Sequence, residues 1–339
     1  MWYLAGKGVC KMDMQQLVYI CTVAEYQSIT KAANSLYISQ PALSHFISKV
    51  EGQLGVQLFD RSTSPLSLTF AGEQYLKYAR QILMMANNMS KELADISKNR
   101  KGRIRVGFPF ERCTYMLPLI LPRYRKKFPG IDVQISSCKG DKLVDGILKG
   151  QLDFAILPFQ NDNKKGRDKK NEMNLATRRI YSEELFLVAA KNVVRPEYLA
   201  DGNPDAVDLN KIKDLPFIFL TKGHALRTFL DLLFDFYKIK PNVFMEIDSN
   251  VCACRLASAG IGVTIVPAMT IELAKCDAEV DIYSLARQPV RWDILALYRK
   301  DAYLSEAEES FFEIAGEVFS QMSFLRNHRG NSRMNTETG

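Results

Sequence analysis

The sequence predicts an N-terminal winged helix-turn-helix (all-α with a small β-wing), a long linker helix, and an α/β domain built from two Rossmann-like lobes. Three short helical patterns and a turn-rich hairpin occupy residues 12–68. A helix with heptad-spaced apolar residues follows them. From Ile104 onward, strand-like runs alternate with helical ones, which is typical of a parallel sheet with helices on its faces.

The composition is that of a globular protein with two or three domains. The chain has 339 residues, 47% hydrophobic and 24% charged, which excludes disordered and collagen-like classes. Its seven cysteines lack a CxxC pair and it has only three histidines, so we expect no disulfide framework, no zinc site and no cofactor. It has no recognisable signal peptide and no run of 18 apolar residues, so we expect a cytoplasmic protein without a membrane span.

Three helices are expected near the N-terminus. Apolar residues recur at helical spacing over residues 17–24, and Ser28 is well placed to cap a second, short helix. Ser39 is a favourable N-cap for a third helix, whose first turn tolerates Pro41. Gly55 then ends this third helix.

The polar face of the third helix carries short or amide-bearing side chains. Gln40, Ser44 and Ser48 are spaced four residues apart, and His45 and Lys49 lie beside them. A glutamine can pair with an adenine edge, and short side chains allow a helix to enter a major groove deeply. A solvated helix face is the alternative interpretation, but the Glu and Lys residues usual on such faces are sparse here.

A hairpin is expected after the third helix. Two strand-like runs, 56–59 and 66–68, flank a turn-rich segment, and together with the three helices they make a winged helix-turn-helix. Arg61 lies at the root of the hairpin, and Thr63 and Ser64 lie at its tip. We expect these side chains to contact phosphates and the minor groove.

Several strings within residues 13–72 carry a family resemblance. They are Ser28-Ile29-Thr30-Lys31-Ala32-Ala33, Leu36, Ile38-Ser39-Gln40-Pro41-Ala42-Leu43-Ser44, Glu51, Leu54-Gly55-Val56, Leu58-Phe59-Asp60-Arg61 and Leu68-Thr69-Phe70-Ala71-Gly72. They resemble the N-terminal domain of LysR-type transcriptional regulators, whose usual opening corresponds to Met12, so we expect residues 1–11 to be an extension. The resemblance implies that the partner is double-stranded promoter DNA with an inverted repeat, and that Thr30 touches a phosphate. The predicted DNA-binding residues are Thr30, Lys31, Ser39, Gln40, Pro41, Ser44, His45, Ser48, Lys49, Arg61, Thr63 and Ser64.

The next helix carries an a/d seam of three heptads. The seam consists of Tyr75, Ala79, Ile82, Ala86, Met89, Leu93 and Ile96. A helix packed on its own domain would also show such a stripe, but we expect nothing in the preceding 60 residues to cover it. We therefore predict pairing with a second chain. The family resemblance likewise implies dimerisation through a linker helix, and a dimer or tetramer would read half-sites about one helical turn apart, or multiples of that.

The net charge of +7 is distributed unevenly. Residues 12–97 contain six basic and seven acidic side chains, whereas residues 98–105 contain five basic and none acidic. We interpret residues 98–105 as a hinge between domains. DNA affinity would then rest on a few placed groups such as Lys31, Lys49 and Arg61.

The C-terminal two thirds are expected to alternate strands and helices. Strands are predicted at 104–108, 133–136, 154–157, 185–188, 217–220, 243–247, 263–266 and 293–298, helices at 110–124, 142–149, 226–236, 251–258 and 305–319, and a loop at 161–174. The last strand and helix are expected to return to the first lobe. Glu306, Glu308 and Glu309 are interpreted as a solvated helix face.

This layout resembles the effector-binding domain of the same family, which is similar to periplasmic solute-binding proteins. The matching positions are Gly107, Leu117-Pro118, 150–156, Glu184-Leu185, 215–218 and 259–267. The predicted domains are an extension 1–11, a head 12–68, a linker helix and hinge 69–100, an effector-binding domain 101–326 and a disordered tail 327–339. Within the effector-binding domain, lobe I is expected at about 101–175 and 284–326, and lobe II at about 176–283.

A small-molecule effector is expected in the cleft between the lobes, because ligands of such sheets bind beyond the carboxyl ends of the strands. The predicted effector-binding residues are Phe110, Arg112, Cys113, Thr114, Lys139, Thr221, His224 and Asn250. Lys139 and Lys222 favour an anionic effector. Phe110 and Glu111, in contrast, depart from the small hydroxyl residues that family members commonly place there to hold a small acid.

The leading interpretation is a DNA-binding regulator without enzymatic activity. Two alternative interpretations remain open. Cys113 at a helix N-terminus would have a lowered pKa and would make the protein a redox-responsive member of the family. A stand-alone cytosolic solute-binding α/β protein is the other alternative, and the heptad seam argues against it.

Overall fold

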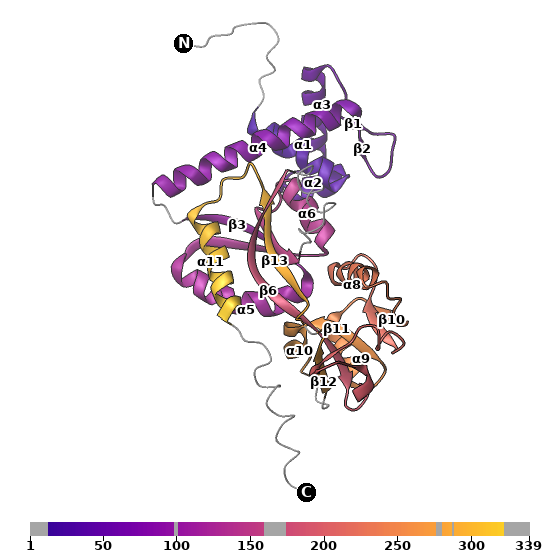
Figure 1. Cartoon of the computed structure of the whole chain (residues 1–339). Coiled ribbons are helices and arrows are strands. Elements are labelled where there is room, and N and C mark those ends of the chain that lie inside the picture. The colour runs from indigo at the N-terminus through magenta and orange to yellow at the C-terminus, as the bar shows by residue number, and fades with distance from the viewer. Residues whose placement is uncertain (1–12, 98–100, 159–173, 276–279, 287, 322–339) are drawn as a thin grey trace. The chain divides into compact units, whose positions relative to one another are not determined.

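The structure is a computed structural model that describes residues 13–97, 101–158, 174–275, 280–286 and 288–321. The chain divides into two compact units, Met1–Ser97 and Lys98–Gly339 (Figure 1). The predicted extension 1–11, the tail 327–339 and all but the last residue of the loop 161–174 lie outside the described residues. The predicted fold class is confirmed.

Three helices and a hairpin form the start of the first unit, and we call this part the head. The long helix of the unit follows it. The helices are α1 (Met14–Tyr26), α2 (Ile29–Ser35) and α3 (Gln40–Leu54). The expected caps are present: Ser28 and Ser39 each accept a hydrogen bond from a backbone N–H of the following turn. Gly55 ends α3 in the left-handed conformation, at φ +71°. Ile20, Val23, Leu43, Ile47 and Val50 form the centre of the core.

The hairpin is short and antiparallel, with β1 (Phe59–Asp60) paired to β2 (Ser67–Leu68). The buried carboxylate of Glu51 in α3 holds its root. Glu51 Oε1 accepts hydrogen bonds from the backbone N–H groups of Leu58 at 2.8 Å and Phe59 at 3.2 Å. The wing is therefore fixed to the third helix by a side chain rather than by strand pairing alone.

The long helix α4 (Phe70–Ile96) is continuous over 27 residues. Its first half packs on the head, so the expectation that nothing in the head covers its seam is wrong there. Ala79 is only 1% exposed, Tyr75 packs against the head core, and α1 lies against α4. The far half is open: Ile82, Met89, Leu93 and Ile96 are exposed, while Ala86 is half-buried.

Lobe I of the second unit is a five-stranded sheet in the order β4-β3-β5-β13-β6. Its strands are β3 (Lys101–Phe108), β4 (Gly130–Ser137), β5 (Phe154–Pro158), β13 (Arg291–Arg299) and the first part of β6 (Leu175–Ala190). The first three are parallel, and β13 runs antiparallel to both of its neighbours. The last strand therefore returns to the first lobe, as predicted.

Helices cover both faces of this sheet. Alternate residues of a strand point to opposite faces, so neighbouring residues of β5 contact different helices. Phe154 and Ile156 pack with the core formed by α5 (Phe110–Lys127) and α11 (Glu306–Gln321). Ala155 and Leu157 pack instead against α6 (Gly140–Leu148).

Lobe II continues from the second part of β6, so this one strand belongs to both lobes (Figure 1). Residues 175–184 of β6 pair with β13, and residues 185–190 pair with β11 and β12. The remaining elements are η1 (Pro196–Tyr198), β7 (Leu199–Ala200), β8 (Asn203–Val207), β9 (Phe217–Leu220), α8 (Ala225–Phe236), β10 (Val243–Ile247), α9 (Asn250–Ser258), β11 (Val263–Pro267), α10 (Ala268–Ala274) and β12 (Val280–Ser284). The short elements η1, β7, β8, α10 and β12 were not predicted, and β6 is far longer than the four residues expected.

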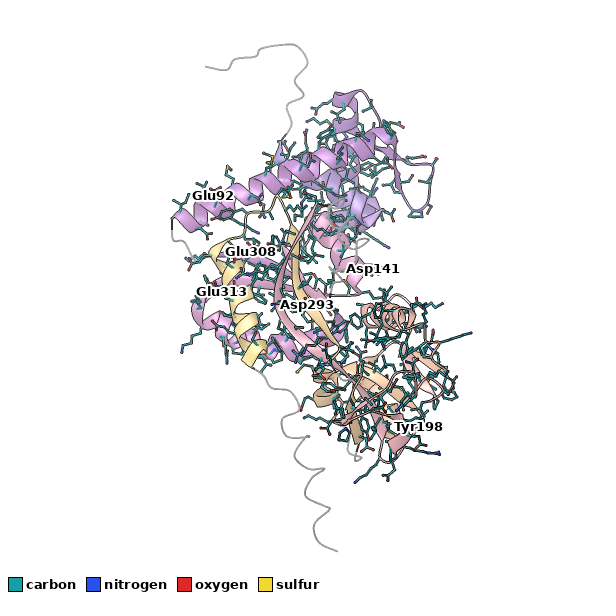
Figure 2. All side chains as sticks on the ribbon, in the orientation of Figure 1. Glu92, Asp141, Tyr198, Asp293, Glu308 and Glu313 are labelled. Atoms are coloured by element: carbon teal, nitrogen blue, oxygen red, sulfur yellow. The ribbon has the colours of Figure 1, made fainter. Side chains whose placement is uncertain are left out.

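The expected solvated face at the start of α11 is wrong for Glu308. This residue, labelled in Figure 2, is 1% exposed, and its Oε2 accepts hydrogen bonds from the backbone N–H and the hydroxyl of Ser305, each at 2.8 Å. The carboxylate is buried because it caps the start of its own helix.

Candidate DNA-binding surface and effector site

The predicted row on α3 is open to solvent. Gln40, His45, Ser48 and Lys49 are exposed and Ser44 is half-buried, whereas Leu43 and Ile47 on the opposite side are fully buried. The helix therefore turns its apolar stripe inward and presents short polar side chains outward. Thr30, Lys31, Ser39, Pro41, Thr63 and Ser64 are exposed as well.

Arg61 is only partly free to meet a phosphate. One of its terminal nitrogens donates to Ser48 Oγ at 3.0 Å and to Glu51 Oε2 at 3.1 Å, while 45% of its side chain remains exposed. Thr63 is also engaged, since its hydroxyl bonds the backbone carbonyl of Asp60 at 3.1 Å and Ser67 Oγ at 2.8 Å. Both side chains therefore shape the wing as well as facing solvent.

Tyr37 is an exposed aromatic residue to which the sequence reasoning gave no role. It lies in the turn between α2 and α3 with φ 57°, and it is 95% exposed. Its left-handed backbone conformation is uncommon for an aromatic residue. The one signal in the sequence that could have identified Tyr37 is its position two residues before Ser39, a predicted DNA-binding residue.

In the second unit, the predicted effector residues follow the carboxyl ends of β3, β4, β9 and β10. Phe110 is the first residue of α5 and is 74% exposed. Thr114 donates a hydrogen bond to the backbone carbonyl of Glu111 at 2.6 Å, and Lys139 precedes α6 as its N-cap residue. These residues come from lobe I.

Arg112 lies in a buried polar cluster instead of at the surface of the lobe. It is 6% exposed, its guanidinium forms an ion pair with Glu183, and it donates to the hydroxyl of Tyr181 at 2.9 Å. Trp292 Nε1 donates to the same carboxylate at 2.7 Å. Burial is the largest influence and would lower the pKa of Arg112, but the charges of Glu183, Tyr115 and Tyr181 and the hydrogen bond with Glu183 together outweigh it and raise the pKa. Arg112 is thus committed to α5, β6 and β13, and it is not available as an open ligand.

Thr221 and His224 meet at Asp248, a residue that the sequence reasoning missed. Thr221 donates a hydrogen bond to the Asp248 carboxylate, and His224 Nε2 lies 3.2 Å from the same oxygen. The hydrogen bond from Thr221, then that from His224, and more weakly the charge of Lys139 hold the pKa of Asp248 below its usual value. Lys139 of lobe I thus acts on a group of lobe II.

Asn250 is brought together with Glu111. Its Nδ2 donates to Glu111 Oε2 at 2.7 Å, and Ser249 Oγ donates to Glu111 Oε1 at 2.8 Å. In the sequence, Glu111 stands out only as a departure from the family pattern. The contact joins α5 of lobe I to the start of α9 in lobe II.

The expected lowered pKa of Cys113 is wrong. Burial raises the pKa of this thiol, and a hydrogen bond with Ser137 opposes the shift only in part. Burial likewise raises the pKa of Cys138, with Lys142 acting in the opposite direction. A raised pKa disfavours the thiolate that a redox sensor needs, so the direction of both shifts argues against the redox-responsive alternative at these two positions.

Over the described ranges, no cluster of three or more His, Cys, Asp or Glu side chains is arranged to hold a metal ion. Within the same ranges no helix has both the length and the apolar character needed to span a membrane.

Comparison with known proteins matches both units. The family described as "LysR substrate binding domain" matches residues 97–320, and "Bacterial regulatory helix-turn-helix protein, lysR family" matches residues 14–73. The uncharacterized HTH-type transcriptional regulator YybE of Bacillus subtilis (strain 168) is 31% identical over 256 residues, which is 76% of this chain and 82% of that protein. YcgK of the same organism, also an uncharacterized HTH-type transcriptional regulator, is 28% identical over 323 residues, or 91% and 96%.

Solved structures share the fold. A full-length OxyR variant from Pseudomonas aeruginosa has a TM-score of 0.64 at 22% identity, covering 92% of this chain and 96% of that one. Full-length CbnR complexed with its target DNA has a TM-score of 0.50 at 22% identity, covering 91% and 99%. Since the two family matches together extend from residue 14 to residue 320, the chain belongs to the LysR family of transcriptional regulators.

Proposed function

We propose that a dimer or tetramer of this chain binds an inverted repeat in promoter DNA in the cytoplasm, with one α3 in a major groove at each half-site. The solvent-facing row of Gln40, Ser44 and Ser48 carries this proposal, because short and amide-bearing side chains fit a helix that enters a groove. The exposed side chains of Lys31 and Lys49 and the free part of Arg61, which bonds Ser48 of the row, would supply contacts to phosphates.

The second half of the proposal is that a small molecule binds between the two lobes and biases their arrangement. Phe110, Cys113, Thr114, Lys139, Thr221, His224 and Asn250 would contact it, and Arg112 would support α5 from the buried side. A ligand changes the regulator only by binding one arrangement of the lobes better than another. The proposal assigns these residues to binding and none of them to catalysis.

The substitution Gln40→Ala tests the DNA-binding half. A lost amide–adenine pair is expected to cost about 1–3 kcal/mol of specific binding and to relax the base preference at one position of each half-site. Footprinting and mobility-shift assays on the DNA upstream of the gene, with a mutated competitor, measure both effects. Gln15→Ala is the matched control, because Gln15 is an exposed glutamine of α1 that bonds Tyr19. Unchanged specificity in Gln40→Ala would refute this role of α3.

A further inference from the structure

Besides the shared strand β6, one carboxylate of lobe I is hydrogen-bonded to lobe II. Glu111, in the first turn of α5, accepts hydrogen bonds from the Ser249 hydroxyl at 2.8 Å, the Asn250 amide at 2.7 Å and the backbone N–H of Val251 at 3.4 Å. The acceptor belongs to lobe I and all three donors belong to lobe II. The bonds span about 140 residues of sequence, so no local pattern produces them.

The Asn250 amide is held in one orientation by this contact. Its Oδ1 is buried and has no hydrogen-bond partner in the described part of the chain. Turning the amide over would satisfy neither group, since Oδ1 would then face the negative charge of Glu111. In the orientation that the structure shows, the amide nitrogen makes its hydrogen bond with Glu111 and only Oδ1 is left without a partner.

The first turn of α5 is also anchored from behind. Arg112, the next residue, is fixed by its buried ion pair with Glu183 on the shared strand β6. Its guanidinium carbon lies 5.4 Å from the centre of the Trp292 ring, and that ring packs edge-on against Phe229 of lobe II. Glu111 is therefore held by a rigid turn at the junction of the lobes.

We propose that Glu111 is a specificity-determining residue: a built-in carboxylate that ties lobe I to lobe II and excludes simple monocarboxylates as effectors. A free monocarboxylate would have to displace a tethered one, whose effective concentration is in the millimolar range or above. The effector is then a molecule recognised through groups other than a single carboxylate. This inference deepens the proposed function and rests on it.

Chemical rescue tests the inference directly. Glu111→Ala removes a group equivalent to acetate, so sodium acetate is the probe. The full-length variant is expected to unfold at a lower temperature than the parent, and acetate is expected to bind it at least about tenfold more tightly than it binds the parent, restoring much of the lost stability. Sodium chloride at equal ionic strength and uncharged acetamide are expected to have no such effect. In a Trp2→Phe background Trp292 is the only tryptophan, so its emission reports the same event at the lobe junction.

Two variants serve as controls. Glu111→Gln keeps one accepting oxygen and fills the same space, so it should fold like the parent and ignore acetate. Asp132→Ala removes an exposed carboxylate that pairs with Arg103 away from α9, and acetate should not rescue it. Equal responses of Glu111→Ala and the parent to acetate would overturn the inference, as would rescue by chloride. Failure of the parent protein to retard its promoter DNA would overturn the proposed function while leaving the acetate result intact.

Discussion

Glu51 joins α3 to the wing through three hydrogen bonds. Its Oε1 accepts hydrogen bonds from two backbone N–H groups at the hairpin root, and its Oε2 accepts a hydrogen bond from the Arg61 guanidinium. A carboxylate with this many donors stabilises a wing whose two strands are only two residues long each. The hydrogen bond between Arg61 and Glu51 Oε2 places the Arg61 guanidinium beside Ser48 of α3, to which it also donates.

Replacing Glu51 by Ala is expected to lower the stability of the head. Two buried N–H groups, of Leu58 and Phe59, would lose their acceptor, and each unsatisfied group costs about 1–3 kcal/mol. Urea denaturation followed by circular dichroism measures the loss. Glu25→Ala is the control, because Glu25 is an exposed carboxylate of α1, and its removal is expected to stay within about 0.5 kcal/mol. Equal effects of the two substitutions would contradict the role given to Glu51.

Local residues of the head could be predicted from sequence, and residues with distant partners could not. Ser28, Ser39 and Gly55 act within a few positions of themselves, so the chain near them contains the whole signal. Arg112 pairs with Glu183, which lies 71 positions away in the sequence. Because that partner is distant, an arginine in the first turn after a strand was predicted to be an exposed ligand-binding residue. Its burial depends on how α5 packs against β6, which no local pattern contains.

Among the elements, α4 has two halves with different surroundings. Leu76 and Ala79 are buried against the head, while Ile82, Met85, Met89, Leu93 and Ile96 form an exposed apolar stripe at helical spacing. The heptad pattern predicted one continuous seam, because period alone cannot tell which part of a stripe the same chain covers. The stripe from Ile82 to Ile96 is the part that the head leaves exposed, and we predict that a second chain covers it.

Leu93→Asp is therefore expected to weaken self-association. A charge placed in a dry helix–helix seam must be desolvated, and the dissociation constant of the dimer is expected to rise at least about tenfold. Sedimentation velocity over a range of concentrations measures the constant. Asn87→Asp adds a charge of the same sign on the other side of α4 and should leave association unchanged. A monomer–dimer equilibrium that moves equally in both variants would count against the stripe as the interface.

The shared strand β6 shows a second limit of sequence patterns. Only its last part, Leu185–Val188, is a continuous apolar run, because that part is buried on both faces. The first part contains the half-buried Arg178 and the exposed Arg179, so it lacks both the apolar run and a regular alternation. The sequence therefore predicted two lobes correctly, but not the strand that unites them.

On the scale of the whole molecule, the positive charge near the hinge is partly neutralised by the effector-binding unit. Arg103 pairs with Asp132 at 2.8 Å, and Arg105 pairs with Asp153 at 3.0 Å while also donating to the carbonyl of Gly150. These two arginines are therefore held by β3 and its neighbours. We therefore expect electrostatic attraction to DNA to rest mainly on the cations of the head.

The salt dependence of DNA binding tests this distribution. With Lys31, Lys49 and Arg61 on each of two heads, six phosphates are neutralised, and the slope of log K against log salt concentration is expected to be about −5. Arg61→Ala removes two of these contacts, so the slope should fall to about −3.5, with similar losses on specific and nonspecific DNA. Because Glu51 competes for the Arg61 guanidinium, a smaller change would mean that the ion pair persists on DNA. Mobility shifts between low and moderate salt give the slopes, and a wild-type slope near −10 would contradict the distribution by requiring hinge cations on the DNA.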